Sequence, residues 1–247
     1  MGGQDGGKIL VQPWQERLAA ANAPRARLTP MWWVAAAGLG LCSIVIVMYV
    51  VNALHWIHDT SDFLAHGYVS SIVAGASARR AVDRDTILYE LSCLVAGICF
   101  VAWFRAAYRI LEDDGVQMRF SRGWAIGAWF VPLLSLWRPK QIANDIWRGS
   151  HLTYAPGNPG VRPVGSVVHW WWGLFLLGDL VFGAGIGLSR VLMPGESVVQ
   201  VLTLERTGFW IAVVGAFMLL TAAGLGATFA WKASQAHDAH GLRGGGF

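Results

Sequence analysis

Asp179 is the residue whose type and position most suggest chemistry in this sequence. It is the only carboxylate near the middle of a long apolar stretch. An ionisable group at such a depth in a membrane is by default a candidate for function. A transporter would use it to hold an ion or a proton, whereas a protonated or hydrogen-bonded Asp179 would only close a helix contact. The sequence leaves both interpretations open.

A second candidate group is basic and follows apolar runs: Arg105, Arg109, Arg138 and Lys140. If these side chains gather at the headgroup level of a bilayer, they would bind the phosphates of anionic lipids. The alternative is that they only set the orientation of the chain in the membrane. We therefore expect membrane lipids, including anionic headgroups, as partners, and we expect no nucleic acid.

The histidines and cysteines do not form a convincing metal or redox site. His55, His58 and Asp59 have a spacing that suits zinc on one helical face, but histidines at a membrane interface usually only hydrate. His55 and His169 belong to opposite ends of their spans, which argues against haem. The three cysteines lie inside apolar runs without a CxxC pair: Cys42, Cys93 and Cys99. HExxH, GxSxG and Walker A motifs are absent, so we expect no enzyme, cofactor or metal.

These candidates are organised around the stretch from Arg119 to Trp147. It begins basic, turns apolar from Trp124 to Trp137, and is interrupted by Pro132. The apolar part has about 14 residues, whereas a spanning helix needs about 20. This pattern predicts a re-entrant or interfacial segment, and a kinked helix packed among neighbours is the alternative. The residues that we expect to matter here are Trp124, Trp129, Pro132, Arg138, Pro139, Lys140 and Trp147.

A new helix is predicted to begin where the apolar run ends. Pro139 favours a turn at Arg138 and suits the first turn of a helix. We therefore expect a surface helix from Pro139 to Ser150. Its apolar side would contain Ile142 and Trp147, and its water-facing side Asp145 and Arg148.

The amino-acid composition is that of a membrane protein. Of the 247 residues, 55% are hydrophobic and only 14% are charged, and the mean hydropathy is +0.45, which favours a multi-pass membrane protein. We predict an all-α membrane protein, a bundle of four transmembrane helices plus a Pro-broken re-entrant or interfacial segment at 123–150. The helical domain is expected at 30–232, with spans at about 31–54, 86–104, 167–189 and 209–231.

The predicted connections are polar. Residues 55–85 are expected to form a loop that includes an amphipathic surface helix at 70–82. Residues 151–163 are expected to form a second loop and residues 190–208 a third. Residues 1–29 and 233–247 are expected to be flexible tails. Gly183 and Gly187 make a GxxxG pair that would let another helix approach closely, and homo-oligomerisation through such faces stays open.

The distribution of basic residues predicts the orientation. If the central stretch does not cross, four spans put both termini on one side with most of the positive charge, and if it crosses the charge divides almost evenly. The positive-inside rule favours the first arrangement, with both termini cytoplasmic in the cell membrane. The two sides would hold Lys8, Arg17, Arg25, Arg27, Arg105, Arg109, Arg119, Arg122, Arg138, Lys140, Arg148, Arg162, Lys232 and Arg243 inside, and Arg79, Arg80, Arg84, Arg190 and Arg206 outside.

A long string of residues between Trp103 and Ser150 resembles a known family. The string contains Trp103-Phe104-Arg105, Tyr108-Arg109, RFSxGWAxGxWFxP from Arg119 to Pro132, Arg138-Pro139, and IWRxS from Ile146. It is similar to an uncharacterised, mainly actinobacterial family of multi-pass membrane proteins, a domain of unknown function. A looser likeness extends through Trp171-Trp172 to residues 232–235. The chain has Arg122 where the family suggests proline and Ser135 where it suggests asparagine.

The resemblance implies a multi-pass helical domain and brings no activity, so three functions stay open. The first is a non-enzymatic protein that scaffolds or regulates partners in the bacterial envelope, with the protein partner unidentified. The second is a small oligomeric transporter or channel that uses the Pro132 segment and Asp179. The third is a module that binds lipid headgroups, or an intramembrane enzyme for which the sequence offers no nucleophile.

Overall fold

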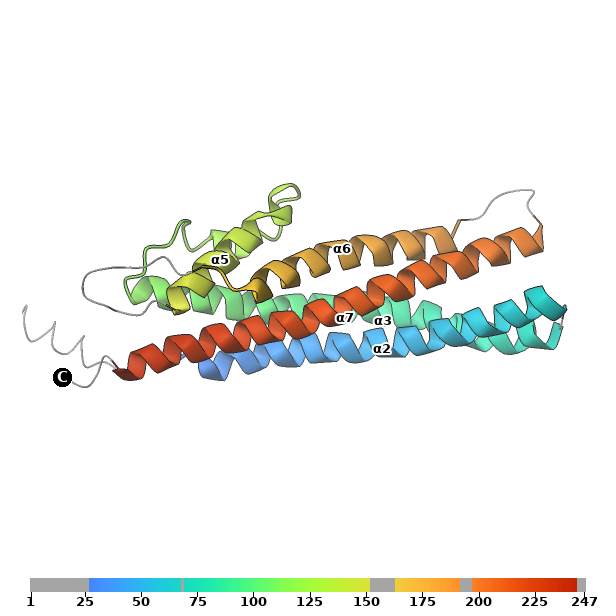
Figure 1. The fold of residues 1–247 in the computed structure, drawn as a ribbon, viewed down its shortest axis with the longest axis horizontal. Helices are drawn as coiled ribbons and strands as arrows, with labels where there is room; N and C mark the ends of the chain where they lie inside the picture. The colour runs from blue at the N-terminus through green and yellow to red at the C-terminus, as the bar shows by residue number, and fades with distance from the viewer. Residues whose placement is uncertain (1–26, 68, 152–162, 192–196, 244–247) are drawn as a thin grey trace, which may run out of the picture.

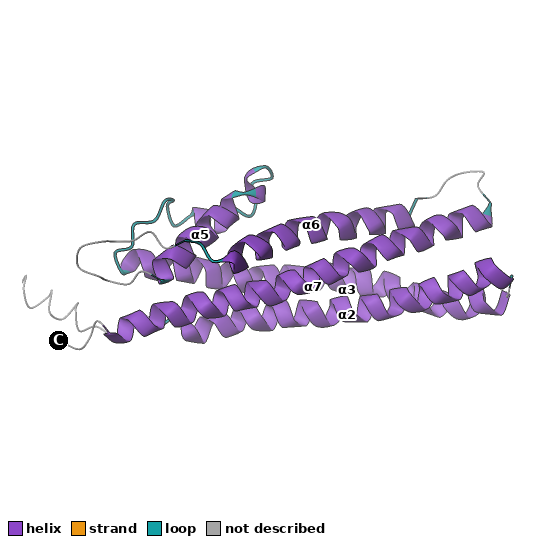
Figure 2. Cartoon of the chain, in the orientation of Figure 1, coloured by secondary structure: helices purple, strands orange, loops and turns teal. Residues whose placement is uncertain are grey.

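A computed structural model describes residues 27–67, 69–151, 163–191 and 197–243. This part of the chain is helical, with no strand (Figure 1, Figure 2). Its elements are α2 (Thr29–His66), α3 (Val69–Asp113), α4 (Trp124–Gly127), the 3₁₀ helix η1 (Leu134–Leu136), α5 (Arg138–Ser150), α6 (Ser166–Ser189) and α7 (Val198–Arg243).

Four of these helices are long and apolar enough to cross a membrane, namely α2, α3, α6 and α7. The predicted all-α membrane protein with four spans is therefore confirmed. Three of these helices, α2, α3 and α7, are much longer than their predicted spans. Helix α7 has 46 residues and is about 69 Å long, whereas the hydrocarbon core of a bilayer is about 30 Å thick.

The predicted loop at residues 55–85 is wrong, because α2 continues to His66 and α3 begins at Val69. Residues 70–82 are helical as expected, but as the first part of α3 instead of a separate helix. Gly67 ends α2 in the left-handed region with φ 71°, and its N–H donates to the Phe63 carbonyl oxygen. The polar residues of this region pair with one another instead of ending the helices. We call this end of the molecule, around Gly67, the hairpin end.

Helix α7 is also longer than its predicted span at both ends. It begins at Val198, inside the predicted loop, and it continues to Arg243, so most of the predicted C-terminal tail is helical. Residues 1–26, 152–162 and 244–247, which include most of the predicted N-terminal tail and the Pro/Gly-rich loop, lie outside the described residues.

The start of α2 and the end of α7 lie at the same end of the bundle, opposite the hairpin end (Figure 1). Asp238 of α7 accepts hydrogen bonds from the backbone N–H groups of Leu28 (3.0 Å) and Thr29 (2.9 Å). The His237 ring lies between the carboxylates of Asp114 (2.7 Å) and Asp238 (3.0 Å). These contacts tie α2, α3 and α7 together at what we call the cap end.

Helices α6 and α7 pack with their backbones almost in contact. A Cβ atom added at Gly185 would lie 2.4 Å from the Ala212 nitrogen. One added at Gly215 would lie 2.4 Å from the Phe182 nitrogen. Small residues allow this approach, and in lipid such close van der Waals packing is a main source of helix association. We call this contact the α6–α7 seam.

The predicted GxxxG pair takes no part in this seam. A Cβ atom at Gly183 or at Gly187 would meet nothing within 4 Å. Both glycines lie on the outer face of α6, so no described helix of this chain uses the close approach that they offer.

Candidate functional site

Residues 116–150, which we call the cap, join the bundle through a cluster of aromatic side chains. The Trp129 ring, just after α4, lies edge-on to Phe100 and Phe104 of α3 and to Trp172 of α6, at centroid distances of 6.1, 5.7 and 5.9 Å. Trp172 also donates its indole N–H to the Leu136 carbonyl oxygen at 3.0 Å. The cap therefore packs directly against helices α3 and α6 of the bundle.

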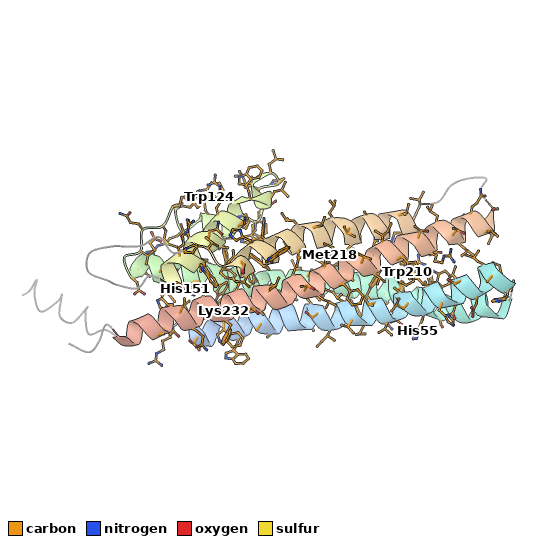
Figure 3. The ribbon with its side chains drawn as sticks, viewed as in Figure 1. His55, Trp124, His151, Trp210, Met218 and Lys232 are labelled. Atoms are coloured by element: carbon orange, nitrogen blue, oxygen red, sulfur yellow. The ribbon has the colours of Figure 1, made fainter. Side chains whose placement is uncertain are left out.

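The first part of the cap is fixed by Tyr108 of α3. Its hydroxyl donates to the Phe120 carbonyl oxygen (2.6 Å) and accepts from the Phe120 N–H (3.0 Å). Arg138 then stacks on this segment, because its guanidinium carbon lies 4.5 Å from the Phe120 ring centroid and 4.6 Å from that of Trp124. Trp124 (labelled in Figure 3) and Arg138 are both half-buried and thus stabilise the fold of the cap.

The turn between the two halves of the cap exposes large apolar side chains. We call residues 130–137 the tip. Phe130 is 75% exposed and Leu133 72% exposed, and Leu136 and Trp137 are also exposed. Pro132 lies exposed between them. A contiguous apolar surface of this kind marks a membrane or protein contact.

The tip satisfies much of its backbone through short local turns. The N–H groups of Phe130 and Ser135 donate to the carbonyl oxygens of Gly127 and Val131, at 3.2 and 2.8 Å. The N–H of Trp137 donates to the Leu134 carbonyl oxygen at 3.2 Å, and the Ser135 hydroxyl to that of Pro132 at 2.7 Å. Paired backbone groups make contact with an apolar phase far less costly.

The helix predicted after the tip is confirmed, since α5 runs over Arg138–Ser150 with proline in its first turn. Ile142 is fully buried, and Trp147 covers Gly165 and stacks on His151 at 4.3 Å. The prediction that Asp145 faces water is wrong, because one of its carboxylate oxygens is buried without a hydrogen-bond partner. Burial raises the pKa of Asp145, and the nearby Arg119 and Arg148 only partly oppose this.

The four basic candidates do not gather in one place. Arg105 and Arg109 are exposed on α3 and line a groove between α3 and α4 with a volume of about 700 Å³. Arg138 stacks on aromatic rings as described above, and Lys140 follows it, half-buried, in the first turn of α5. Only Arg105 and Arg109 share this groove.

Asp179 is exposed on α6 and lies close enough to Tyr89 and Cys93 of α3 to interact with them electrostatically. It has no hydrogen-bond or ion-pair partner within the described ranges. Asp179 therefore lies beside α3 without a hydrogen bond or ion pair that would close a helix contact in the described part of the chain.

In the part of the chain that the structure describes, no group of three or more His, Cys, Asp or Glu side chains could hold a metal ion. His58 lies 3.7 Å from Asp62. The Sγ atoms of Cys42 and Cys93 lie 3.5 Å apart as free thiols between α2 and α3.

Sequence reasoning missed the residues that fix the cap end, above all Tyr108, Trp172 and Asp238. Tyr108 belongs to the motif that carries the family resemblance, and Trp172 to a run of tryptophans. These sequence features could have identified Tyr108 and Trp172 as structural residues. No sequence pattern identifies Asp238, because its partners Leu28 and Thr29 lie more than 200 residues away along the chain.

Comparison with known proteins gives one family. The sequence matches the family described as Domain of unknown function (DUF4328) over residues 85–231, which include most of α3, the whole cap, α6 and most of α7. Neither a curated protein nor a solved structure matches the chain. Since this match covers more than half of the sequence, the chain belongs to the DUF4328 family, whose function is unknown.

Proposed function

We propose that this protein is a non-catalytic protein of the cell membrane that holds a folded cap at the cytoplasmic face, where the cap docks or regulates protein partners. The observation that carries this proposal is the shared core of cap and bundle. Ala125, Ala128, Ile142 and Ile146 of the cap are buried with Trp103 and Phe229 of the bundle. A surface held this rigidly suits recognition by other proteins.

The cytoplasmic orientation is supported by charge. Of the described basic residues, Arg79, Arg80, Arg84, Arg190 and Arg206 belong to the hairpin end and the neighbouring end of α6, and the others belong to the cap end. Cytoplasmic segments next to spans carry an excess of Lys and Arg. The cap end is therefore the cytoplasmic end in this proposal.

We further propose that the tip enters the cytoplasmic leaflet without crossing the bilayer. Trp129 contacts Phe100, which lies about 6 Å inside the predicted end of its span at Phe104. Figure 1 supports the same path. The green segment before α5 runs along the length of the bundle away from the cap end, and α5 returns to the cap end. The exposed Phe130 and Leu133 side chains would then face lipid.

Transport by this chain is the weaker proposal. Asp179 is exposed on α6 and Pro132 is exposed at the tip, and neither residue belongs to the described lining of the groove beside α3. An intramembrane enzyme would also need a nucleophile beside a base, and we identify no such pair at the cap.

Single-cysteine labelling in a cysteine-free background tests the orientation. We would place cysteines at Asn144 and Ser166 on the cap side and at Ala65 at the hairpin end, and add a membrane-impermeant maleimide to intact cells and to inverted vesicles. We expect Ala65 to label from outside, and Asn144 and Ser166 only from inside. Labelling of Asn144 from outside would refute the proposal.

Photo-crosslinking in cells tests the docking role. A photo-reactive amino acid at Gln117, exposed on the cap, should give discrete crosslinked protein bands. The same amino acid at Ala65 is the matched control. Bands from Gln117 that disappear when Trp129→Ala loosens the cap would support docking by the folded cap. Equal patterns from both positions, or none from Gln117, would contradict it.

A further inference from the structure

A groove runs along the outer face of α3, and its lining changes character from one end to the other. Leu94, Ile98 and Val101 of α3 form an apolar floor, and Ile126 and Phe130 of the cap form one wall. At the cap end of the groove the lining turns basic, with Arg105 and Arg109. None of the described residues that line the groove carries a carboxylate.

The length of the groove matches one leaflet of a bilayer. The lining extends along α3 from Cys93 to Arg109, which is about 24 Å of helix. The apolar part from Cys93 to Ala102 accounts for about 14 Å, close to half of a hydrocarbon core that is about 30 Å thick. Arg105 and Arg109 follow directly after this apolar part.

Three arginines of the described chain have a carboxylate counterion. Arg79 pairs with Glu205, Arg84 with Asp85, and Arg122 with Glu112. Within the described ranges, neither Arg105 nor Arg109 has a hydrogen-bond or ion-pair partner. They lie four residues apart on one helical face, so both guanidinium groups can reach one anion.

We propose that this groove binds one anionic phospholipid from the cytoplasmic leaflet. One acyl chain lies along Leu94, Ile98 and Val101 against the cap, and the phosphate lies between Arg105 and Arg109. Guanidinium groups bind phosphate oxygens through paired, charge-assisted hydrogen bonds. The lipid site goes beyond the docking role proposed above and does not depend on any protein partner.

Native mass spectrometry of the purified full chain in detergent tests the lipid site. The probes are phosphatidylglycerol and phosphatidylcholine with identical acyl chains, and soluble glycerol phosphate as the headgroup alone. Both lipids carry the phosphate, but the choline cation of phosphatidylcholine would lie beside the two arginines and be repelled by them. We therefore expect one phosphatidylglycerol to bind at least about tenfold more tightly than phosphatidylcholine. Equal affinity for both lipids would overturn the proposal. Glycerol phosphate that binds as tightly as the lipid would also overturn it, because the site would then hold a free phosphate.

Charge variants locate the phosphate. Arg105→Gln and Arg109→Gln should each lower the affinity for phosphatidylglycerol by about tenfold. Lys232→Gln is the matched control, because Lys232 is exposed at the same end on α7 and does not line the groove (Figure 3). If Lys232→Gln weakens binding as much as Arg105→Gln, only diffuse charge attracts the lipid and the groove site is refuted.

A steric variant locates the acyl chain without changing charge. Gly97 lines the groove, and a Cβ atom there meets nothing within 4 Å. Gly97→Phe should therefore fill the groove and abolish the preference for phosphatidylglycerol while the fold stays intact. Gly40→Phe on α2 is the control, because that glycine is equally open and lies outside the groove. Retained preference in Gly97→Phe would contradict the proposal.

Discussion

The α6–α7 seam and the junction between α3 and the cap solve the same packing problem in opposite ways. In the seam, Gly185 and Gly215 bring two backbones into contact and leave no space. At the junction, large rings such as Trp129 and Phe100 keep the backbones apart and leave a groove on the outer side. The difference teaches that small residues produce closed helix pairs, whereas bulky aromatic residues produce a joint with room for a ligand.

The largest effect is expected in the seam. Gly185→Ala would place its Cβ atom against the Ala212 backbone, so the helices must separate, and we expect a loss of about 3 kcal/mol in unfolding free energy. Gly183→Ala is the control, since it meets open space and should gain up to about 1 kcal/mol from helix propensity. Unfolding in micelles with increasing SDS measures both. Equal losses at the two positions would remove the distinction between closed and open faces.

A smaller effect is expected from the polar contacts of the cap end. Asp238→Ala would leave the N–H groups of Leu28 and Thr29 without their acceptor at the start of α2. A helix N-terminus that loses such a carboxylate should destabilise the protein by about 1.5 kcal/mol. Asp62→Ala, which removes an exposed carboxylate beside His58, should change stability by less than about 0.5 kcal/mol. If Asp238→Ala costs no more than Asp62→Ala, the cap end is not held by this contact.

The attachment of the cap itself should respond to one hydroxyl group. Tyr108→Phe removes both hydrogen bonds to the Phe120 backbone, and we expect a local loss of about 1 kcal/mol. Hydrogen exchange should become faster in residues 116–124 and stay unchanged in the seam. Tyr49→Phe is the matched control, because the Tyr49 hydroxyl is buried without a hydrogen-bond partner. Faster exchange in both variants would show a general loosening instead.

The smallest effect concerns Asp145 and depends on pH. Since burial raises its folded-state pKa, the folded protein takes up this proton more readily than the unfolded chain. The wild type should therefore gain stability relative to Asp145→Ala as the pH falls from 7 towards the ordinary aspartate value of about 3.9. At pH 7 the free energy of unfolding of the variant should be the same as that of the wild type or higher by less than about 1 kcal/mol. Thermal unfolding of both proteins across this range checks the sign, and a wild-type advantage confined to pH 7 would contradict it.

Local signals made part of this architecture predictable. Hydropathy located all four spans, and Pro139 predicted the start of α5 at Arg138. The long polar ends of α2 and α3 were not predictable in the same way, because hydropathy reports only the part of a helix that meets lipid. Those ends are stabilised by pairs between helices, such as Arg79 with Glu205.

The rotation of each helix about its axis was the other missing information. Glycines occur on all sides of α6, and the sequence favoured Gly183 and Gly187 over Gly178 and Gly185, which make the seam. The groove was hidden for the same reason, since only the fold places Ile126 of the cap beside Arg105 of α3. Contacts between distant segments decide both features, and local sequence patterns do not contain them.

The central claim is that the tip enters the cytoplasmic leaflet, and a measurement of the depth of the tip in the bilayer tests it most directly. A spin label would be attached to a single cysteine at Leu133, which is 72% exposed, in lipid vesicles, with the label at Ala65 as the aqueous control. Its collision rates with oxygen, which concentrates in lipid, and with a water-soluble nickel complex would then be compared. Our account predicts that Leu133 behaves as a lipid-immersed site of the cytoplasmic leaflet. A Leu133 label as accessible to nickel as the Ala65 label would show that the tip lies in water and would contradict the account.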